Sequence, residues 1–255
     1  MKRTKIYSLL LLIALLGLWE GIVRIREISA LILPAPSAIV LSLVQHFRSG
    51  YFYPHIAATS LEVIAGFLLG AVVGIGLGFL VSQSKMTQEI LQPYIIASQA
   101  MPKLALAPLL VLWFGFGYAP KIIIVSLVCF FPLFESTVTG LSHVSHEKIA
   151  LFRSLRASSF QTLIKLRVPT AIPYIFSGLR VAIVLSVVGA VVAEFIGANK
   201  GLGALIIASQ GMLNTTLMFA VFMLLTVKGI LLYQLIFWIE QLFFKKYRYS
   251  RGEEK

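Results

Sequence analysis

Four ionisable side chains fall inside or at the ends of long apolar runs, namely Lys103, Glu135, Arg180 and Glu194. A charge at membrane depth is costly, so such residues commonly pair with one another or line a path for a solute. We therefore take all four as candidate pathway residues. Glu135 and Arg180 would lie at similar depth in neighbouring spans, where they could neutralise one another. Glu194 could instead be a solvated anchor, and the Lys103 side chain could extend to the membrane surface.

Catalytic motifs do not accompany these charges. The sequence holds no GxxxxGK[ST], HExxH or GxSxG pattern, so it predicts no nucleotide-binding loop, zinc protease site or esterase nucleophile. Its four histidines lack the spacing of metal ligands, and its single cysteine, Cys129, excludes an internal disulfide. We expect no enzyme activity, no metal and no cofactor bound by this chain. The energy for active transport would have to come from a partner.

The composition places the chain in a membrane. Of its 255 residues, 58% are hydrophobic and 13% are charged, and the mean hydropathy is +0.91. A soluble domain of this size has too little polar surface to cover so much apolar material. The formal net charge is +12. Nucleic acid is a weak explanation for this excess, because the cations gather at the ends of apolar runs and in one loop.

The length of the apolar runs predicts an all-α, polytopic membrane protein with about six transmembrane helices. The expected spans are 6–23, 56–81, 90–114, 121–141, 173–196 and 217–244. The first span resembles a signal peptide, but its apolar part is too long and no small-residue cleavage site follows, so we expect it to be retained. The third contains Pro93, Pro102 and Pro108, which predict a broken helix that borders the pore.

The distribution of lysine and arginine predicts the orientation, because cytoplasmic loops carry an excess of both. The segments assigned to the cytoplasm hold Lys2, Arg3, Lys5, Lys85, Lys148, Arg153, Arg156, Lys165, Arg167, Lys245, Lys246, Arg248, Arg251 and Lys255. Those assigned to the outside hold only Arg24, Arg26, Arg48, Lys121 and Lys200. Both termini are therefore expected to face the cytoplasm.

Glycine recurs every four residues in the second span, at Gly66, Gly70, Gly74 and Gly78. This spacing places the four on one face of a helix, where another helix backbone can approach closely. We interpret them as helix-packing positions. The segment GIGLGF in this span lies mid-membrane and does not follow a strand, so it does not predict a dinucleotide-binding loop.

The second half of the chain has one sizeable polar interruption, HEKIALFRSLRASSFQTLIKLRVPTAIP, residues 146–173. Its apolar residues recur at roughly helical spacing and its cations form a counterface, which predicts one or two short amphipathic helices. A folded basic loop between two spans is a natural docking surface for a cytoplasmic partner. Taken alone, the same pattern is also typical of an amphipathic segment that lies on the membrane surface.

Several strings together carry a family resemblance: LPAPSAI, MPKLALAPLLVLWFGFG, FFPLFESTVTGL and AEFIGANKGLGALI. With the basic loop, they make the chain similar to the membrane permease subunit of a binding-protein-dependent ABC importer, within the nitrate, sulfonate and taurine branch. The resemblance covers nearly the whole chain and implies a type I ABC importer permease fold. It implies an N-terminal transmembrane helix and outer segment over 1–55, and an importer core over 56–255 with a coupling loop at 146–172.

In this family the loop forms a coupling helix that fits a cleft on the ATPase, with the pattern Glu-Ala-Ala, three residues, Gly and, further on, an aliphatic residue and Pro. The chain departs from this pattern at its front, and Arg156 stands at the glycine position. We expect Arg156 not to copy the turn or the close contact that glycine permits there. The resemblance assigns to the coupling loop Ala150, Leu151, Phe152, Arg153, Leu155, Arg156, Ala157, Ser158, Leu166 and Pro169.

The resemblance also implies the activity and its partners. A permease homodimer in the bilayer of a bacterial inner membrane would enclose the path, and two ATPase subunits carrying ATP and Mg would drive it. A binding protein would deliver the solute to outer loops such as 197–214, and no nucleic acid would take part. The solute would be a small anion such as nitrate, sulfonate or taurine, or a thiamine-precursor pyrimidine.

Two rival classes differ in what they require. A self-sufficient secondary carrier or channel would require an inverted repeat with paired broken helices. The sequence shows one broken span and no convincing second copy of such a span. A membrane-embedded hydrolase would need two catalytic groups that face each other within the spans, and no such pair stands out.

Overall fold

The fold is described by a computed structural model over residues 2–250, so the predicted cytoplasmic cations Arg251 and Lys255 lie outside the described residues. This described part is helical and contains no strand, which confirms the predicted all-α class. A 3-10 turn, η1, spans Lys103–Leu106, and a π-helical turn, η2, spans Leu163–Arg167. The α-helices are α1 Lys2–Ile25, α2 Pro36–Arg48, α3 Tyr53–Val81, α4 Lys85–Ala100, α5 Ala107–Phe114, α6 Tyr118–Ser142, α7 His146–Ser154, α8 Ser159–Thr162, α9 Val168–Glu194, α10 Leu202–Gly211 and α11 Thr215–Ser250.

Within the described residues, 5 helical segments are long and apolar enough to cross a membrane. They correspond to five of the about six predicted spans. The segments are Ile6–Ile25, Tyr53–Val81, Tyr118–Ser142, Ser159–Glu194 and Thr215–Phe244. The fourth of these begins well before the predicted fifth span, because the helix runs without interruption from the second half of the basic loop into the apolar region.

The predicted third span, 90–114, is divided among α4, η1 and α5. Met101 adopts an extended conformation, with φ −67° and ψ 126°, because the ring of Pro102 disfavours α-helical geometry in the residue before it. The two α-helical pieces contain 16 and 8 residues. Each is shorter than the roughly 20 residues that a membrane crossing needs.

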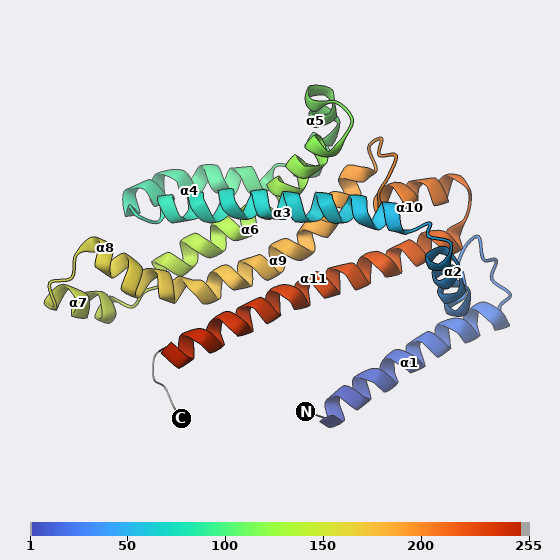
Figure 1. The fold of residues 1–255 in the computed structure, drawn as a ribbon, viewed down its shortest axis with the longest axis horizontal. Coiled ribbons are helices and arrows are strands. Elements are labelled where there is room, and N and C mark those ends of the chain that lie inside the picture. Colours follow the sequence, from blue (N-terminus) through green and yellow to red (C-terminus); the bar gives the residue numbers. More distant parts are fainter. Residues whose placement is uncertain (1, 251–255) are drawn as a thin grey trace.

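The main bundle consists of α3, α6 and α9, which pack closely side by side (Figure 1). The predicted packing glycines of α3 lie in this contact. A Cβ atom on Gly70 would fall 2.7 Å from the carbonyl oxygen of Ser126, and one on Gly74 would fall 2.7 Å from that of Phe130. Because nothing larger than hydrogen fits, the backbones of α3 and α6 approach each other directly.

A second apolar cluster joins α2, α10 and the first turns of α11, and we call these elements the outer unit. Its buried side chains are Ile39, Phe52, Leu202, Leu205, Ile206, Leu217, Ala220 and Val221. The core of the main bundle is formed by a different set, Val63, Phe67, Ala71, Val125, Cys129, Leu133, Ala182, Ile183, Val187, Ala190 and Ile236. The main bundle and the outer unit are therefore packed around separate cores.

The outer unit and the helices of the basic loop lie at opposite ends of the molecule. Figure 1 shows α2 and α10 toward one end, and α7 and α8 beyond the other. The start of α1 and the end of α11 point toward the α7–α8 end. The two ends of the described chain and the basic loop thus lie on the same side of the bundle.

Helix α1 stands apart from the main bundle in Figure 1 and is fixed near its end. The Glu20 carboxylate accepts a hydrogen bond from the Ser37 backbone N–H at 2.9 Å and another from the Ser37 hydroxyl at 2.8 Å. A carboxylate at the first turn of α2 also compensates the unpaired N–H groups of that turn. The Trp19 ring meets Phe219 of α11, with 6.0 Å between the centroids.

The glycine contact yields a test with a matched control on the same helix. Gly70→Ala should lower the free energy of unfolding by about 1–3 kcal/mol, because its methyl group would displace the α6 backbone. Gly76→Ala should leave stability equal or slightly higher, because a Cβ there meets nothing within 4 Å. Thermal unfolding of both purified variants in detergent compares them. Equal stability of the two variants would contradict the assigned contact.

Candidate functional site

The basic loop folds into two short helices that expose apolar and basic side chains together. We call residues 146–167 the basic hairpin. Leu151, Leu155 and Phe160 are exposed to 56%, 69% and 69%. Lys148, Arg153, Arg156 and Lys165 are also exposed, and none takes part in an ion pair within the described structure. Exposed apolar groups among unpaired cations are typical of a surface that a partner covers.

The turn between the two helices has the geometry that glycine usually provides. Arg156 has φ +53°, and its N–H donates to the Arg153 carbonyl at 2.9 Å. The next N–H, of Ala157, donates to the Phe152 carbonyl at 3.0 Å. Together these bonds form a Schellman motif that ends α7. The expectation that Arg156 cannot copy the glycine turn is therefore wrong: the arginine adopts it, at the cost of a left-handed backbone conformation.

The second helix begins with a capping box. The Ser158 side chain accepts from the Gln161 N–H at 3.2 Å, and the Gln161 side chain accepts from the Ser158 N–H at 2.9 Å. Helix α8 then continues through η2 into α9. Pro169 has no N–H to donate to the preceding turn, which accounts for the change to π-helical bonding beside it. Ser158 and Pro169 of the predicted loop thus shape one helix that reaches from the basic hairpin to Glu194.

Arg180 does not pair with Glu135. It pairs with Glu240 of α11, and Glu135 lies exposed on α6. Gly178 of α9 packs against α6, where a Cβ would fall 2.5 Å from the Ser136 hydroxyl oxygen. Arg180, two residues further, therefore lies on the other side of the helix, toward α11. The proposed neutralisation across α6 and α9 is wrong for this geometric reason.

Lys103 occupies the break in the predicted third span. Its Nζ lies 5.0 Å from the centroid of the Phe131 ring, which is a cation–π distance. The side chain is half-buried. Lys103 therefore lies beside the main bundle at a point where the helix is interrupted. Its role as a pathway residue stays a prediction.

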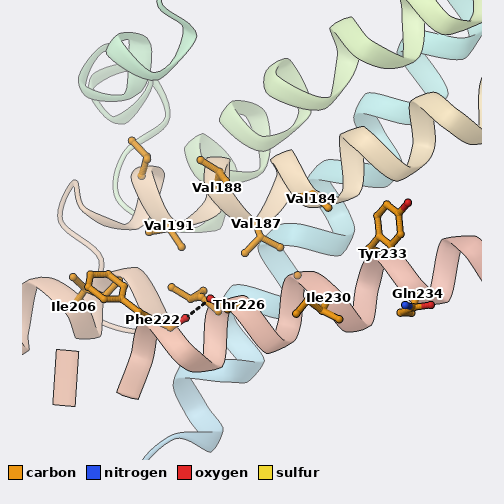
Figure 2. A pocket seen from close by; sticks show the side chains of 13 residues that line it. Val184, Val187, Val188, Val191, Ile206, Phe222, Thr226, Ile230, Tyr233 and Gln234 are labelled. Carbon is orange, nitrogen blue, oxygen red and sulfur yellow. Dashed lines mark hydrogen bonds between the residues drawn. The ribbon is translucent and has the colours of Figure 1, made fainter. Parts of the chain in front are cut away.

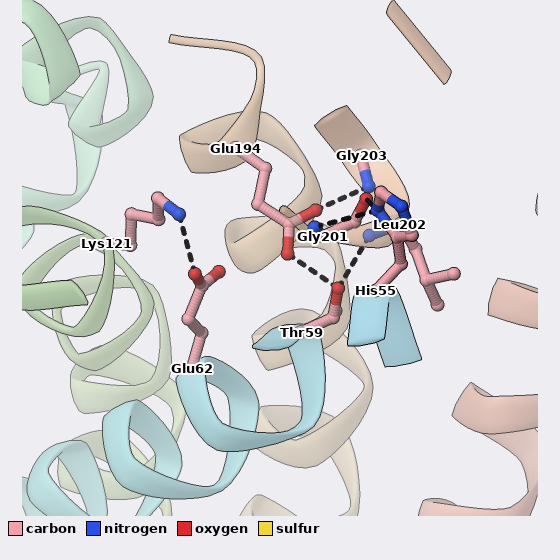
Figure 3. A network of polar contacts seen from close by, with 8 residues as sticks. All are labelled: His55, Thr59, Glu62, Lys121, Glu194, Gly201, Leu202 and Gly203. Atoms are coloured by element: carbon pink, nitrogen blue, oxygen red, sulfur yellow. Dashed lines mark hydrogen bonds and ion pairs between the residues drawn. The ribbon is translucent and has the colours of Figure 1, made fainter. Parts of the chain in front are cut away.

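Glu194 is neither exposed nor a solvated anchor. It is 1% exposed, and its carboxylate accepts from the Thr59 hydroxyl at 2.6 Å and from the backbone N–H of Gly203. The Thr59 oxygen in turn accepts from the Leu202 N–H at 2.8 Å. Figure 3 shows these groups meeting between α3, the end of α9 and the start of α10.

An ion pair lies next to this cluster. Lys121 of α6 donates to Glu62 of α3 at 2.7 Å, and Glu62 is fully buried (Figure 3). Lys121 was counted above among the outside cations, at the start of the predicted fourth span. The structure shows that it is a buried partner inside the bundle. Lys228 of α11 donates to the Ser60 hydroxyl at 2.9 Å nearby. Glu62, Lys228 and Glu240 are not among the four predicted pathway residues. Each of them interrupts an apolar run, and this is the sequence feature that could have identified them.

A groove of about 680 Å³ runs between α9 and α11 (Figure 2). Its lining includes Val184, Val188, Phe222 and Ile230, and none of the four predicted pathway residues. Such a wall suits an acyl chain or another apolar helix better than a small anion, which needs hydrogen-bond donors or cations. We therefore do not place the solute path in this groove.

Residues 66–249 match the family described as binding-protein-dependent transport system inner membrane component. A Haemophilus influenzae ABC transporter permease protein is 35% identical, over 94% of this chain and 97% of that protein. The chain belongs to this permease family. The aliphatic sulfonates transport permease protein SsuC of Bacillus subtilis is 33% identical, over 87% of this chain and 80% of its own length. The predicted branch of ABC importer permeases is confirmed.

A solved structure has the same fold as the permease. It is the MetNI methionine ABC transporter in an inward-facing conformation, with a TM-score of 0.65 and 17% sequence identity, over 74% of this chain and 94% of that one. The permease is therefore a multi-pass inner-membrane subunit of an ABC importer, with the helical fold expected from its sequence. The family membership favours the predicted importer permease over the alternative, a self-sufficient secondary carrier or channel.

The Arg156 turn can be tested by hydrogen–deuterium exchange of the basic hairpin. Arg156→Gly should slow exchange, because glycine removes a left-handed penalty of about 1–2 kcal/mol. Arg153→Gly, a control inside α7, should speed exchange, since glycine in a helix costs about 1 kcal/mol. Faster exchange in both variants would contradict the assigned turn.

The corrected pairing of Arg180 gives a second test. Glu240→Gln should lower thermal stability measurably, because it leaves a half-buried arginine without its partner, a loss of about 2–3 kcal/mol. Glu135→Gln, the matched control, should change little, because Glu135 is exposed. Both are read by the melting temperature in detergent. A larger loss from Glu135→Gln would restore the rejected pairing.

Proposed function

We propose that the permease docks on a cytoplasmic ATPase through the basic hairpin, and that two copies of each subunit form the transporter. The observation that carries this proposal is the exposure of Leu151, Leu155 and Phe160 among cations at one end of the bundle. ATP and Mg would be bound by the ATPase, since the chain has no nucleotide-binding motif. The partner's cleft should be apolar at its centre and acidic at its rim.

The hairpin is suited to passing on a movement because it is continuous with a membrane span. The helical segment Ser159–Glu194 covers 36 residues, which corresponds to roughly 54 Å at 1.5 Å per residue. A displacement at α8 would therefore reach the far end of α9 without crossing a flexible linker. Alternating access would follow when ATP closes the two ATPase subunits and moves both hairpins.

The orientation follows from the same arrangement. With the basic hairpin in the cytoplasm, the positive-inside rule would put both ends of the chain on the cytoplasmic side. In Figure 1 the start of α1 and the end of α11 point toward the hairpin, which supports this orientation. The outer unit, with α2 and α10, would then face the other side of the membrane. A soluble binding protein would dock there, and the segment 197–214 would be part of its contact.

A small anion is the solute class that we infer for this permease. The SsuC relative carries the name of an aliphatic sulfonate permease, and Lys103 places a cation at the interrupted helix beside the main bundle. A cation held by an aromatic ring in a half-buried position attracts an anion without holding it permanently. Nitrate, a sulfonate and taurine share this chemistry. The binding protein would choose among them.

Docking is tested by co-purification of the ATPase from cells that express it together with the permease. Replacing residues 150–161 by a Gly/Ser linker of equal length should abolish co-purification, while membrane insertion persists. The double reversal of Arg153→Glu with Arg156→Glu should weaken it in a salt-dependent way, because both cations are exposed.

The matched control for charge reverses two exposed cations away from the hairpin, Arg48→Glu with Lys200→Glu. It should leave the ATPase bound. If the linker variant retains the ATPase as well as the unaltered permease does, the hairpin is not the docking surface. If only the control pair loses the ATPase, the proposed orientation is wrong.

A further inference from the structure

The main bundle and the outer unit meet through apolar side chains and through a small set of polar contacts. Ile56 of α3 and Val191 of α9 pack against the core of the outer unit, and Leu225 of α11 packs against both cores. Apolar contacts alone do not fix one relative position, because they are non-directional. The hydrogen bonds among Glu194, Thr59 and the Gly201–Gly203 backbone cross between the two parts (Figure 3). We call these three groups the outer clasp.

Each member of the outer clasp comes from a different element. Glu194 is the last residue of α9, Thr59 lies in the second turn of α3, and Gly201–Gly203 forms the start of α10. The Thr59 hydroxyl both donates to Glu194 and accepts from Leu202. His55 adds a fourth contact, with its Nδ1 2.9 Å from the Gly201 carbonyl oxygen. The start of α10 is therefore held from two helices of the main bundle.

The backbone of α10 approaches the carboxylate too closely for any side chain. Gly201 has φ +136°, and a Cβ there would fall 2.3 Å from the Glu194 Cδ. A Cβ on Gly203 would fall 2.5 Å from the Val191 carbonyl oxygen. The two glycines let the N–H groups at the start of α10 turn directly toward α9 and α3.

Charged neighbours keep the site polar in an otherwise apolar region. The elements around Glu194 contribute Glu62 and His55 from α3, Lys121 from α6 and Lys228 from α11. Lys121 neutralises Glu62, and Lys228 lies within electrostatic range of both carboxylates. Because Glu194, Thr59 and Glu62 are shielded from water, the hydrogen bonds among these groups are stronger and more costly to break than surface bonds.

We propose that the outer clasp makes α10 move as one body with α9, so that a displacement of α9 reaches the outer surface of the permease. Glu194 and Thr59 are then positioning residues of transport, and they do not contact the solute. The inference rests on the proposed function in one respect: the displacement begins at the basic hairpin, at the other end of the Ser159–Glu194 helix. The clasp itself is a property of the permease alone.

The test measures the distance between spin labels on α9 and α10. Ser177 and Gln210 are exposed and carry the labels after substitution by cysteine, in a Cys129→Ala background. The full permease is measured alone in nanodiscs and, with its co-purified ATPase, in the nucleotide-free and ATP–vanadate-trapped states. Labelled permease is diluted into unlabelled permease, so that distances between two copies do not contribute. The unaltered clasp should then give one narrow distance distribution that is the same in all three.

Thr59→Val removes the hydroxyl while keeping the side-chain shape, so it should add a second distance peak. Thr59→Ser retains the hydroxyl and should restore the single peak. The matched control is Thr137→Val: Thr137 is equally buried, at 1% exposure, but its hydroxyl bonds only to the Leu133 carbonyl within α6, at 2.6 Å. Melting temperatures of the variants separate a loss of position from a loss of folding.

The outcomes separate this inference from the proposed function. A single unchanged peak in Thr59→Val, alone and in the trapped complex, would overturn the clasp. A second peak of equal size in Thr137→Val would do the same, because the effect would then be a general loosening. If no ATPase co-purifies, the docking proposal fails, and the permease measured alone still decides whether the clasp holds α10.

Discussion

Direct backbone contact between α3 and α6 is the constraint on which the rest of the structure depends. Four glycines bring the two helices together until no Cβ fits between them. In a membrane, where apolar helices gain nothing by leaving lipid, such close packing supplies much of the attraction between helices. The contact also fixes the position of α3 and α6 relative to each other along their axes. Because the two helices cannot slide past each other, Glu62 of α3 and Lys121 of α6 meet at 2.7 Å.

Charged side chains in the interior form pairs or hydrogen bonds with groups on other helices. The ion pair of Glu62 and Lys121 joins α3 to α6, and that of Arg180 and Glu240 joins α9 to α11. Glu194 is matched differently, by a hydroxyl and a backbone N–H. Removing one partner of such a set leaves an uncompensated group away from water, so each set fixes its helices in one register.

One continuous helix connects the two functional ends of the molecule. The basic hairpin, with its exposed apolar and basic groups, lies at its start, and Glu194 lies at its end. Pro169 and the π-helical turn beside it lie near the hairpin, and Pro173 lies inside α9. The helical segment nevertheless continues without interruption to Glu194.

The sequence by itself determined the class, the spans, the glycine face and the basic hairpin, because hydropathy, spacing and charge act locally and repeat along the chain. It also showed that prolines interrupt the third span. Only the tertiary structure decided which charges meet. Arg180 pairs with Glu240 and not with Glu135, and Lys121 is buried in an ion pair with Glu62. Arg156 adopts the backbone conformation of a glycine turn. These outcomes depend on how each helix is rotated against its neighbours. That rotation is set by contacts between residues far apart in the sequence, such as Thr59 and Glu194, which are 135 positions apart.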